Sequence, residues 1–273
     1  MKYIFLDIDN SLYNYKIKNI SESTLIAFKR ARAAGHKIFI CTNNLVDDLK
    51  KMLNNEVDGF VLASGAIAYC GEKRVLNQEL AVDKIQSLTK SLEALKMGYC
   101  LIGEFNRYCN ERGRLQTERY CGYGELDLNY KKTTAKGYRN IADWDNQTPI
   151  YKIDIIGDNY LKQNKIAEII SAEFQNKFIY ENSQLPLYIN EIVQKDTNIT
   201  TGLKAILNYN GASLYDTVVI SDCNYNQALL ELCDIKIAMG NNCSNLKALA
   251  DFQTSEFIED GIYNAFKEFN LLG

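Results

Sequence analysis

The sequence predicts an α/β protein built on a doubly wound parallel sheet, with a second α/β domain inserted into the first. Short apolar runs alternate with helical patterns at both ends of the chain, which is typical of a parallel sheet covered by helices on both faces. These runs lack polar alternation, as expected for strands buried on both sides. The middle of the chain alternates polar and apolar residues, which suits a sheet with one face in solvent.

The first part of the chain predicts alternating strands and helices. Ser21 stands in a Ser-Glu-Ser-Thr segment that can cap a helix, and Gly35 can end it. The expected elements, in chain order, are a strand over residues 3–6, a helix over 25–34, a strand over 37–41, a helix over 47–54 and a strand over 59–62.

The end of the chain repeats this alternation, and the middle interrupts it. The expected elements are a helix over 201–209, a strand over 217–220, a helix over 226–233, a strand over 235–239 and a helix over 244–250. We therefore predict a core domain in two parts, residues 1–76 and 190–273, with an inserted α/β domain over residues 77–189.

Composition limits the classes of partner. The chain has 273 residues, 47% of them hydrophobic, and a formal net charge of −3, which is enough for a sizeable core and argues against disorder. No basic block stands out, so neither nucleic acid nor an anionic membrane is expected as the main partner. No Gly-x-Gly-x-x-Gly segment follows a predicted strand, which argues against a Rossmann-type nucleotide binder.

The cysteines and the histidine favour a reducing compartment and exclude common mechanisms. Eight cysteines are scattered without a Cys-x-x-Cys pair, so neither a disulfide framework nor a zinc site is expected. No signal-peptide pattern or membrane-spanning stretch is present, and we expect free thiols and a cytoplasmic protein. His36, the one histidine, stands in a Gly-His-Lys turn, where a surface or turn role is expected rather than catalysis.

Three predicted strands end in polar residues that phosphate chemistry uses. Asp7, Thr42 and Asp222 each follow an apolar run. Ligands of parallel sheets bind at the carboxyl ends of the strands. The three side chains would therefore converge if their strands are neighbours, and Thr42 could then donate its hydroxyl to a phosphoryl oxygen.

A pair of aspartates adds an acid–base function. Asp7 and Asp9 lie two residues apart in an extended segment, so both can point to one side. One carboxylate could attack phosphorus while the other protonates the leaving oxygen. With Asp222, three anions would share a crevice, and Mg²⁺ would offset their repulsion. Singly, each residue can also be a helix cap or a turn residue; their order and shared position favour chemistry.

These residues carry a resemblance to a known family. Residues 4–12, Ile-Phe-Leu-Asp-Ile-Asp-Asn-Ser-Leu, resemble the first motif of the haloacid dehalogenase (HAD) superfamily, usually Asp-x-Asp-Gly-Thr-Leu, and Thr42 matches its second motif. The resemblance covers both ends of the chain by motif and the middle only by its position and length. It implies a Rossmann-like core with an inserted, mobile α/β cap that closes over the substrate and carries specificity.

Segments near the end of the chain point to a subfamily. Residues 218–230, the Ala-Met-Gly-Asn segment 238–241 and the Glu-Asp-Gly segment 259–261 resemble the Cof-type sugar-phosphate phosphatases. The Ser-Gly-Ala segment 64–66 stands where that subfamily usually has Asn-Gly-Ala. The Thr-Asn-Asn run 42–44 is also similar to NagD-like phosphatases, but the Ala-Met-Gly-Asn segment favours the Cof type.

The resemblance implies a role for each motif residue. Asp7 would be the nucleophile that forms an aspartyl-phosphate, and Asp9 the general acid and base. Mg²⁺ would be held by Asp7, the backbone carbonyl of Asp9, and Asp222. Thr42 and Asn43 would bind the phosphate.

The first and fourth motifs depart from the family pattern, as does the third. Asn10 and Ser11 replace the usual Gly and Thr, so bulk is added beside the nucleophile. In the fourth motif, Tyr225 replaces an Asn and Asn226 replaces an Asp, so one acidic charge near the metal is lost.

The third motif lacks its phosphate-binding lysine. The alignment puts Ile199 at that position. Lys195, four residues upstream, could substitute for it as a phosphate ligand, whereas Lys204 is expected to be a solvated helix lysine.

The favoured function is a Mg²⁺-dependent phosphatase acting on a small phosphorylated metabolite. The alternative is a degenerate member that binds a phosphorylated ligand or a protein partner with little or no turnover. Four arginines of the inserted domain are candidates for reading an anionic substrate, although a solvated basic face is the simpler interpretation of any one of them: Arg107, Arg112, Arg114 and Arg119.

Overall fold

The computed structural model divides the chain into two compact units. The first comprises Met1–Asn77 and Asn198–Gly273, and the second comprises Gln78–Thr197. The second unit ends later than the predicted residue 189, because the strand Leu187–Gln194 pairs with the sheet of the second unit. The structure describes residues 1–7, 20–42, 53, 56–123, 138–157, 164–182, 187–222, 227–240 and 244–273.

One eight-stranded sheet organises the first unit. Its order is β14-β13-β12-β1-β2-β3-β4-β5, with β1 at the centre between β12 and β2. The pairs from β14 to β3 are parallel. The strands are β1 (Tyr3–Asp7), β2 (Lys37–Cys41), β3 (Gly59–Leu62), β4 (Ile67–Cys70), β5 (Lys73–Asn77), β12 (Thr217–Ser221), β13 (Ile235–Ala238) and β14 (Phe252–Gln253).

The sheet is mixed rather than wholly parallel, which corrects the prediction at one edge. β3 pairs with β4, and β4 with β5, in antiparallel fashion. The connection between β4 and β5 is the two-residue turn at Gly71 and Glu72, and Gly71 has a φ of 56°. A parallel pair needs a crossover of a dozen or more residues, so this hairpin can only be antiparallel.

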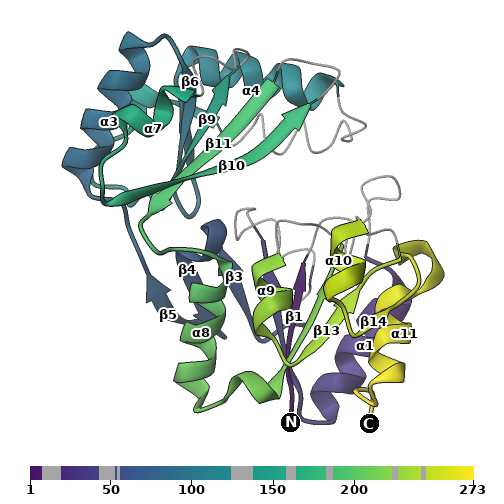
Figure 1. Cartoon of the computed structure of the whole chain (residues 1–273). Coiled ribbons are helices and arrows are strands. Elements are labelled where there is room, and N and C mark those ends of the chain that lie inside the picture. Colours follow the sequence, from purple (N-terminus) through teal and green to yellow (C-terminus); the bar gives the residue numbers. More distant parts are fainter. Residues whose placement is uncertain are drawn as a thin grey trace. The chain divides into compact units, whose positions relative to one another are not determined.

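Helices cover both faces of this sheet (Figure 1). Leu203 of α8, Leu229 of α9 and Leu246 of α10 share one core cluster with Phe5 and Phe39. α1 and α11 pack against each other through a contact between two phenylalanine rings. The helices are α1 (Glu22–Ala33), α8 (Ile199–Asn210), α9 (Gln227–Leu232), α10 (Ser244–Leu249) and α11 (Gly261–Glu268), with the short 3-10 helices η1 (Ala63–Gly65), η3 (Leu214–Asp216) and η5 (Phe257–Glu259).

The structure contains every predicted helix and strand of the first unit, apart from one helix that lies outside the described residues. Ser21 caps α1, since its hydroxyl accepts a hydrogen bond from the backbone N–H of Thr24. α8 begins at Ile199, two residues before the predicted start, because Asn198 and Thr201 form a reciprocal capping box. The predicted helix over residues 47–54 lies outside the described residues except for Leu53.

The second unit has its own sheet, in the order β10-β11-β9-β6-β7-β8. All pairs are antiparallel except β7 with β8. The elements are α3 (Val82–Ala94), β6 (Gly98–Ile102), β7 (Arg107–Cys109), α4 (Glu111–Tyr123), β8 (Tyr138–Asn140), η2 (Ile141–Asp143), β9 (Lys152–Gly157), α7 (Ile166–Ile169), β10 (Phe174–Asn182) and β11 (Leu187–Gln194).

The two faces of this second sheet differ in polarity. Ile153 and Ile155 of β9 share a core with residues of α3 and α7. The opposite face carries a charged row, with residues on β7, β9, β11 and β10 and none on β6, which lies between β7 and β9: Arg107, Asp154, Lys152, Glu191 and Lys177. The alternation predicted one face in solvent, but Lys152 is 4% exposed and Glu191 is 0% exposed. Lys152 tolerates burial because its ammonium forms ion pairs with Glu191 at 2.8 Å and with Asp154 at 3.2 Å.

A disulfide in the second unit contradicts the expectation of free thiols throughout. Cys100 of β6 and Cys109 of β7 are bonded, with their Cα atoms 4.1 Å apart. They stand directly opposite each other in an antiparallel pair, which brings two Cβ atoms within bonding reach. Cys41, Cys70 and Cys233 are free thiols.

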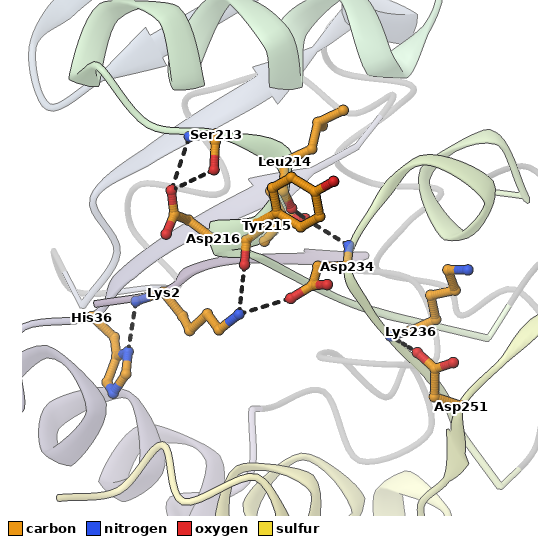
Figure 2. A network of polar contacts seen from close by, with 10 residues as sticks. Lys2, His36, Ser213, Leu214, Tyr215, Asp216, Asp234, Lys236 and Asp251 are labelled. Carbon is orange, nitrogen blue, oxygen red and sulfur yellow. Dashed lines mark hydrogen bonds and ion pairs between the residues drawn. The ribbon is translucent and has the colours of Figure 1, made fainter.

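A network of hydrogen bonds and ion pairs lies at the amino ends of the strands in the first unit (Figure 2). Lys2 donates its ammonium to the backbone carbonyl of Tyr215 at 2.7 Å and to the carboxylate of Asp234 at 2.9 Å. His36 follows α1, as predicted for a turn residue, and its Nδ1 accepts the backbone N–H of Lys2 at 2.9 Å. Among the described residues, no helix is long and apolar enough to cross a membrane.

Candidate active site

Three predicted site residues come together at the carboxyl edge of the first sheet. Asp7 is the last residue of β1, and Thr42 and Asp222 directly follow β2 and β12. These strands are neighbours: Asp7 lies opposite Cys41 of β2, and Leu6 lies opposite Ile220 of β12. The three strands are parallel, so all three polar residues lie at the same edge, as their order in the sequence predicted.

These residues are buried although they are polar. Asp7 is 6% exposed, Thr42 is 4% exposed and Asp222 is 8% exposed. The backbone N–H of Thr42 donates to the carbonyl of Val61 at 2.9 Å, which continues the β2–β3 pairing past the end of β2. Burying two carboxylates beside each other is costly unless positive charge offsets them.

The thiol beside Asp7 is not a competing nucleophile. Cys41 is fully buried and lies opposite Asp7 in the sheet register. Burial raises the pKa of the Cys41 thiol well above its ordinary value, and the nearby Asp7 carboxylate raises it further. A protonated, inaccessible thiol is unreactive, so the carboxylate is the group suited to attack.

The segment that follows β3 also lies at the carboxyl ends of the parallel strands. Its residue Ser64 was not among the predicted site residues. Ser64 follows β3, is 0% exposed, and has a φ of 59°. Gly65, next to it, has a φ of 96°, and a Cβ there would overlap the backbone carbonyl of Asn198. Only glycine therefore fits, and the Ser-Gly-Ala segment 64–66 is held against the start of α8. Its similarity to the Asn-Gly-Ala segment was the available signal.

The third-motif position and its candidate substitute lie in different units. Ile199 is the first residue of α8, is 3% exposed, and belongs to the apolar core of the first unit. A Cβ added to Gly65 would lie 2.9 Å from the Cα of Ile199. The third-motif position therefore packs against the segment that follows β3. Lys195 has an exposed side chain in the turn after β11, in the second unit. Lys204 is exposed on α8, as expected for a solvated lysine.

Two predicted site residues, Asp9 and Asn43, lie outside the described residues. In the described part of the chain, no group of three or more His, Cys, Asp or Glu residues could hold a metal ion. Asp7 and Asp222 do provide two buried carboxylates at neighbouring strand ends. Hard oxygen donors of this kind fit Mg²⁺, which commonly uses one or two protein carboxylates and completes its shell with water and phosphate oxygens.

The four candidate arginines have different surroundings. Arg107 is half-buried in the charged row, and its guanidinium lies 5.6 Å from the centre of the Tyr138 ring. Arg112 and Arg114 are exposed on α4 and pair with glutamates, which fits the simpler interpretation of a solvated face. The side chain of Arg119 lies outside the described residues.

Comparisons with known proteins agree with the motifs and the fold. A family model described as haloacid dehalogenase-like hydrolase matches residues 4–266. The putative phosphatase YkrA of Bacillus subtilis (strain 168) is 24% identical over 272 residues, covering 99% of this chain and 98% of YkrA. The solved HAD subclass IIB sugar phosphatase BT4131 is 20% identical with a TM-score of 0.77, covering 99% of this chain and 100% of its own. BT1666, a phosphatase from Bacteroides thetaiotaomicron, is 17% identical with a TM-score of 0.79, covering 99% of this chain and 96% of its own.

Proposed function

Because the chain belongs to the haloacid dehalogenase-like hydrolase family, we propose that it is a phosphatase acting on a small phosphorylated metabolite, of which a sugar phosphate is the favoured class. The observation that carries this proposal is the buried edge where Asp7, Thr42 and Asp222 follow three neighbouring parallel strands. Similar proteins named as phosphatases, one of them a sugar phosphatase, support the substrate class.

The proposed reaction has two steps. An oxygen of the Asp7 carboxylate attacks phosphorus, and the bond from phosphorus to the ester oxygen breaks, which gives an aspartyl-phosphate. Asp9 gives its proton to the departing alcohol oxygen and then takes one from the water that hydrolyses the aspartyl-phosphate. Thr42 and Asn43 hold phosphoryl oxygens, so inorganic phosphate and the free alcohol are the products.

Asp7, Asp222 and the backbone carbonyl of Asp9 would hold a Mg²⁺ ion in this proposal. When bound, the ion offsets the negative charge of the carboxylates and the phosphate. The burial of Asp7 and Asp222 supports this assignment, because Asp7 could otherwise approach an anionic phosphate only against strong repulsion.

The missing lysine bears on the rate. Ile199 contributes no charge at the edge of the site. We assign the compensating positive charge to Lys195, whose side chain is exposed. A cytoplasmic location also belongs to this proposal.

The test is a screen of the purified protein against a panel of phosphate esters, measured as inorganic phosphate released. Hydrolysis of one or more sugar phosphates is expected with Mg²⁺ and its loss is expected with a chelator. Hydrolysis that is unaffected by the chelator would contradict the metal assignment. Binding of phosphorylated ligands without turnover across the whole panel would contradict the phosphatase and favour the degenerate alternative.

A further inference from the structure

We propose that Cys100 and Cys109 form a reversible redox pair that holds the edge strands β7 and β8 on the sheet of the second unit. The two residues are opposite each other in the β6–β7 register and are bonded in the structure. Cys100 also lies opposite Asp154 of β9. The bond therefore joins a strand in the middle of the sheet to the strand next to its edge, and it lies on the face that carries the charged row.

Few other backbone contacts hold this edge. β7 and β8 have three residues each, and β7 pairs with β6 and with β8 over three residue pairs on either side. The backbone hydrogen bonds of strands this short add little net stability, because ordering each residue costs about 1–2 kcal/mol in conformational entropy. The bond closes a chain separation of nine residues, so it removes many open conformations of the β6–β7 hairpin.

The hairpin also positions one end of the charged row. Arg107 is two residues before Cys109, and its guanidinium stacks over Tyr138 of β8. Burial raises the pKa of the Asp154 carboxyl, and Arg107 is one of the positive charges that oppose this increase. Fraying of β7 would therefore separate Arg107 from the Tyr138 ring.

The distribution of cysteines suggests a reversible bond rather than a general framework. Among the cysteines whose side chains are described, Cys41, Cys70 and Cys233 are free thiols. In a reducing compartment a single disulfide of this kind is typically transient and redox-sensing. Its formation removes two protons and two electrons from the pair, and the electrons reduce glutathione disulfide to two glutathione molecules.

Burial controls how the pair exchanges. Cys100 is 1% exposed and Cys109 is 3% exposed, so an external thiol reaches the bond only when the edge opens locally. Reduction should therefore be slow in buffer and faster in mild urea.

The experiment equilibrates the full chain in glutathione buffers that range from strongly reducing to strongly oxidising, traps thiols with acid and an alkylating reagent, and maps the peptides by mass spectrometry. The expected result is a change from dithiol to disulfide within the series, while Cys70 stays a thiol as the internal control. A pair that stays bonded in the most reducing buffer is a permanent structural disulfide, and a pair that stays reduced in the most oxidising buffer forms no bond. Either result overturns the proposal.

Hydrogen exchange of the same unmodified protein tests what the bond holds. In the reduced state, amides of β7 and β8 should exchange at least about tenfold faster, with β9 and β11 unchanged. The double variant C100S/C109S should exchange like the reduced protein in both buffers, whereas the matched variant C70S should keep the redox response. Equal protection of β7 and β8 in the two redox states would overturn the holding role.

Discussion

The two sheets of this protein place their polar side chains in different ways. In the first unit the central strands are apolar on both faces, and Asp7, Thr42 and Asp222 stand where strands end. In the second unit the polar groups, such as Lys152 and Glu191, lie along one face of the strands themselves. A parallel sheet covered by helices leaves its polar side chains at the ends of the strands. The antiparallel sheet carries charged side chains along one face, where ion pairs accompany their burial.

If catalysis takes place at the carboxyl ends of the strands of the first sheet, as we propose, Asp7→Asn should have the largest effect. An amide cannot act as the nucleophile, so ester hydrolysis should fall by about 10⁴-fold or more. The measurement is phosphate release, with circular dichroism to confirm folding.

The matched control for this variant is Asp251→Asn. Asp251 accepts the backbone N–H of Lys236 at 2.9 Å, in the network at the amino ends of the strands (Figure 2). This variant should keep nearly full activity. Retention of most of the rate by the Asp7 variant would rule out the aspartyl-phosphate route.

The charged row of the second sheet is expected to matter for stability, which Lys152→Met tests. Removing the buried ammonium takes away the ion pair that Glu191 forms with Lys152 at 2.8 Å. Breaking a buried ion pair by removing one partner costs about 3–5 kcal/mol. Urea unfolding, followed by a probe in the second unit, measures this.

The double variant Lys152→Met with Glu191→Met serves as the control, since it removes both charges together. It should recover much of the lost stability. If the single variant were as stable as the original protein, solvent would have to reach this face of the second sheet.

Lys195 is the residue to which we assign the positive charge of the third motif. Lys195→Met should then lower the rate of hydrolysis by about a hundredfold, the usual effect of losing one group that stabilises transition-state charge. Lys204→Met, the same substitution at an exposed position of α8, should have little effect. Equal rates in the two variants would remove Lys195 from the mechanism.

The smallest expected effect concerns His36, at the amino ends of the strands of the first sheet. It is an effect on the pH dependence of stability and not on the reaction. Burial, the terminal amino group and Lys2 lower the pKa of His36, and its Nδ1 must be unprotonated to accept the N–H of Lys2. The pKa of an unperturbed histidine in the unfolded chain is about 6.5. At pH values between the folded pKa and this unfolded pKa, the unfolded chain binds more protons than the folded chain. Stability is therefore fully present above that unfolded value and is lost as pH falls through the folded pKa.

Melting temperatures from pH 7.5 to pH 5 measure this loss. In His36→Gln a neutral side-chain oxygen can accept the same N–H, so this variant should show a shallower decline than the original protein. Identical pH profiles would mean that His36 contributes nothing to the pH dependence of stability.

Local pattern was enough to predict the strand ends that form the candidate site. A strand buried on both faces appears in the sequence as a continuous apolar run. We could therefore identify β1, β2 and β12, together with the polar residues that follow them. The capping segment 21–24 was also identifiable, and within it Ser21 accepts a hydrogen bond from the backbone N–H three residues later. These features depend on contacts between near neighbours in the chain.

Other features depend on which distant segments meet, and only the tertiary structure decided them. The end of the second unit was misplaced because β11 pairs with β9, about 35 residues earlier, rather than with the first sheet. The burial of Lys152 requires Glu191 on the neighbouring strand, and no spacing within β9 indicates that partner. Cys100 and Cys109 illustrate the same limit: scattered cysteines predict no bond, and the antiparallel register of β6 and β7 places them opposite each other. Gly65 belongs to this group as well, because the group that excludes its Cβ is the carbonyl of Asn198, which the chain reaches only after the whole second unit has been inserted.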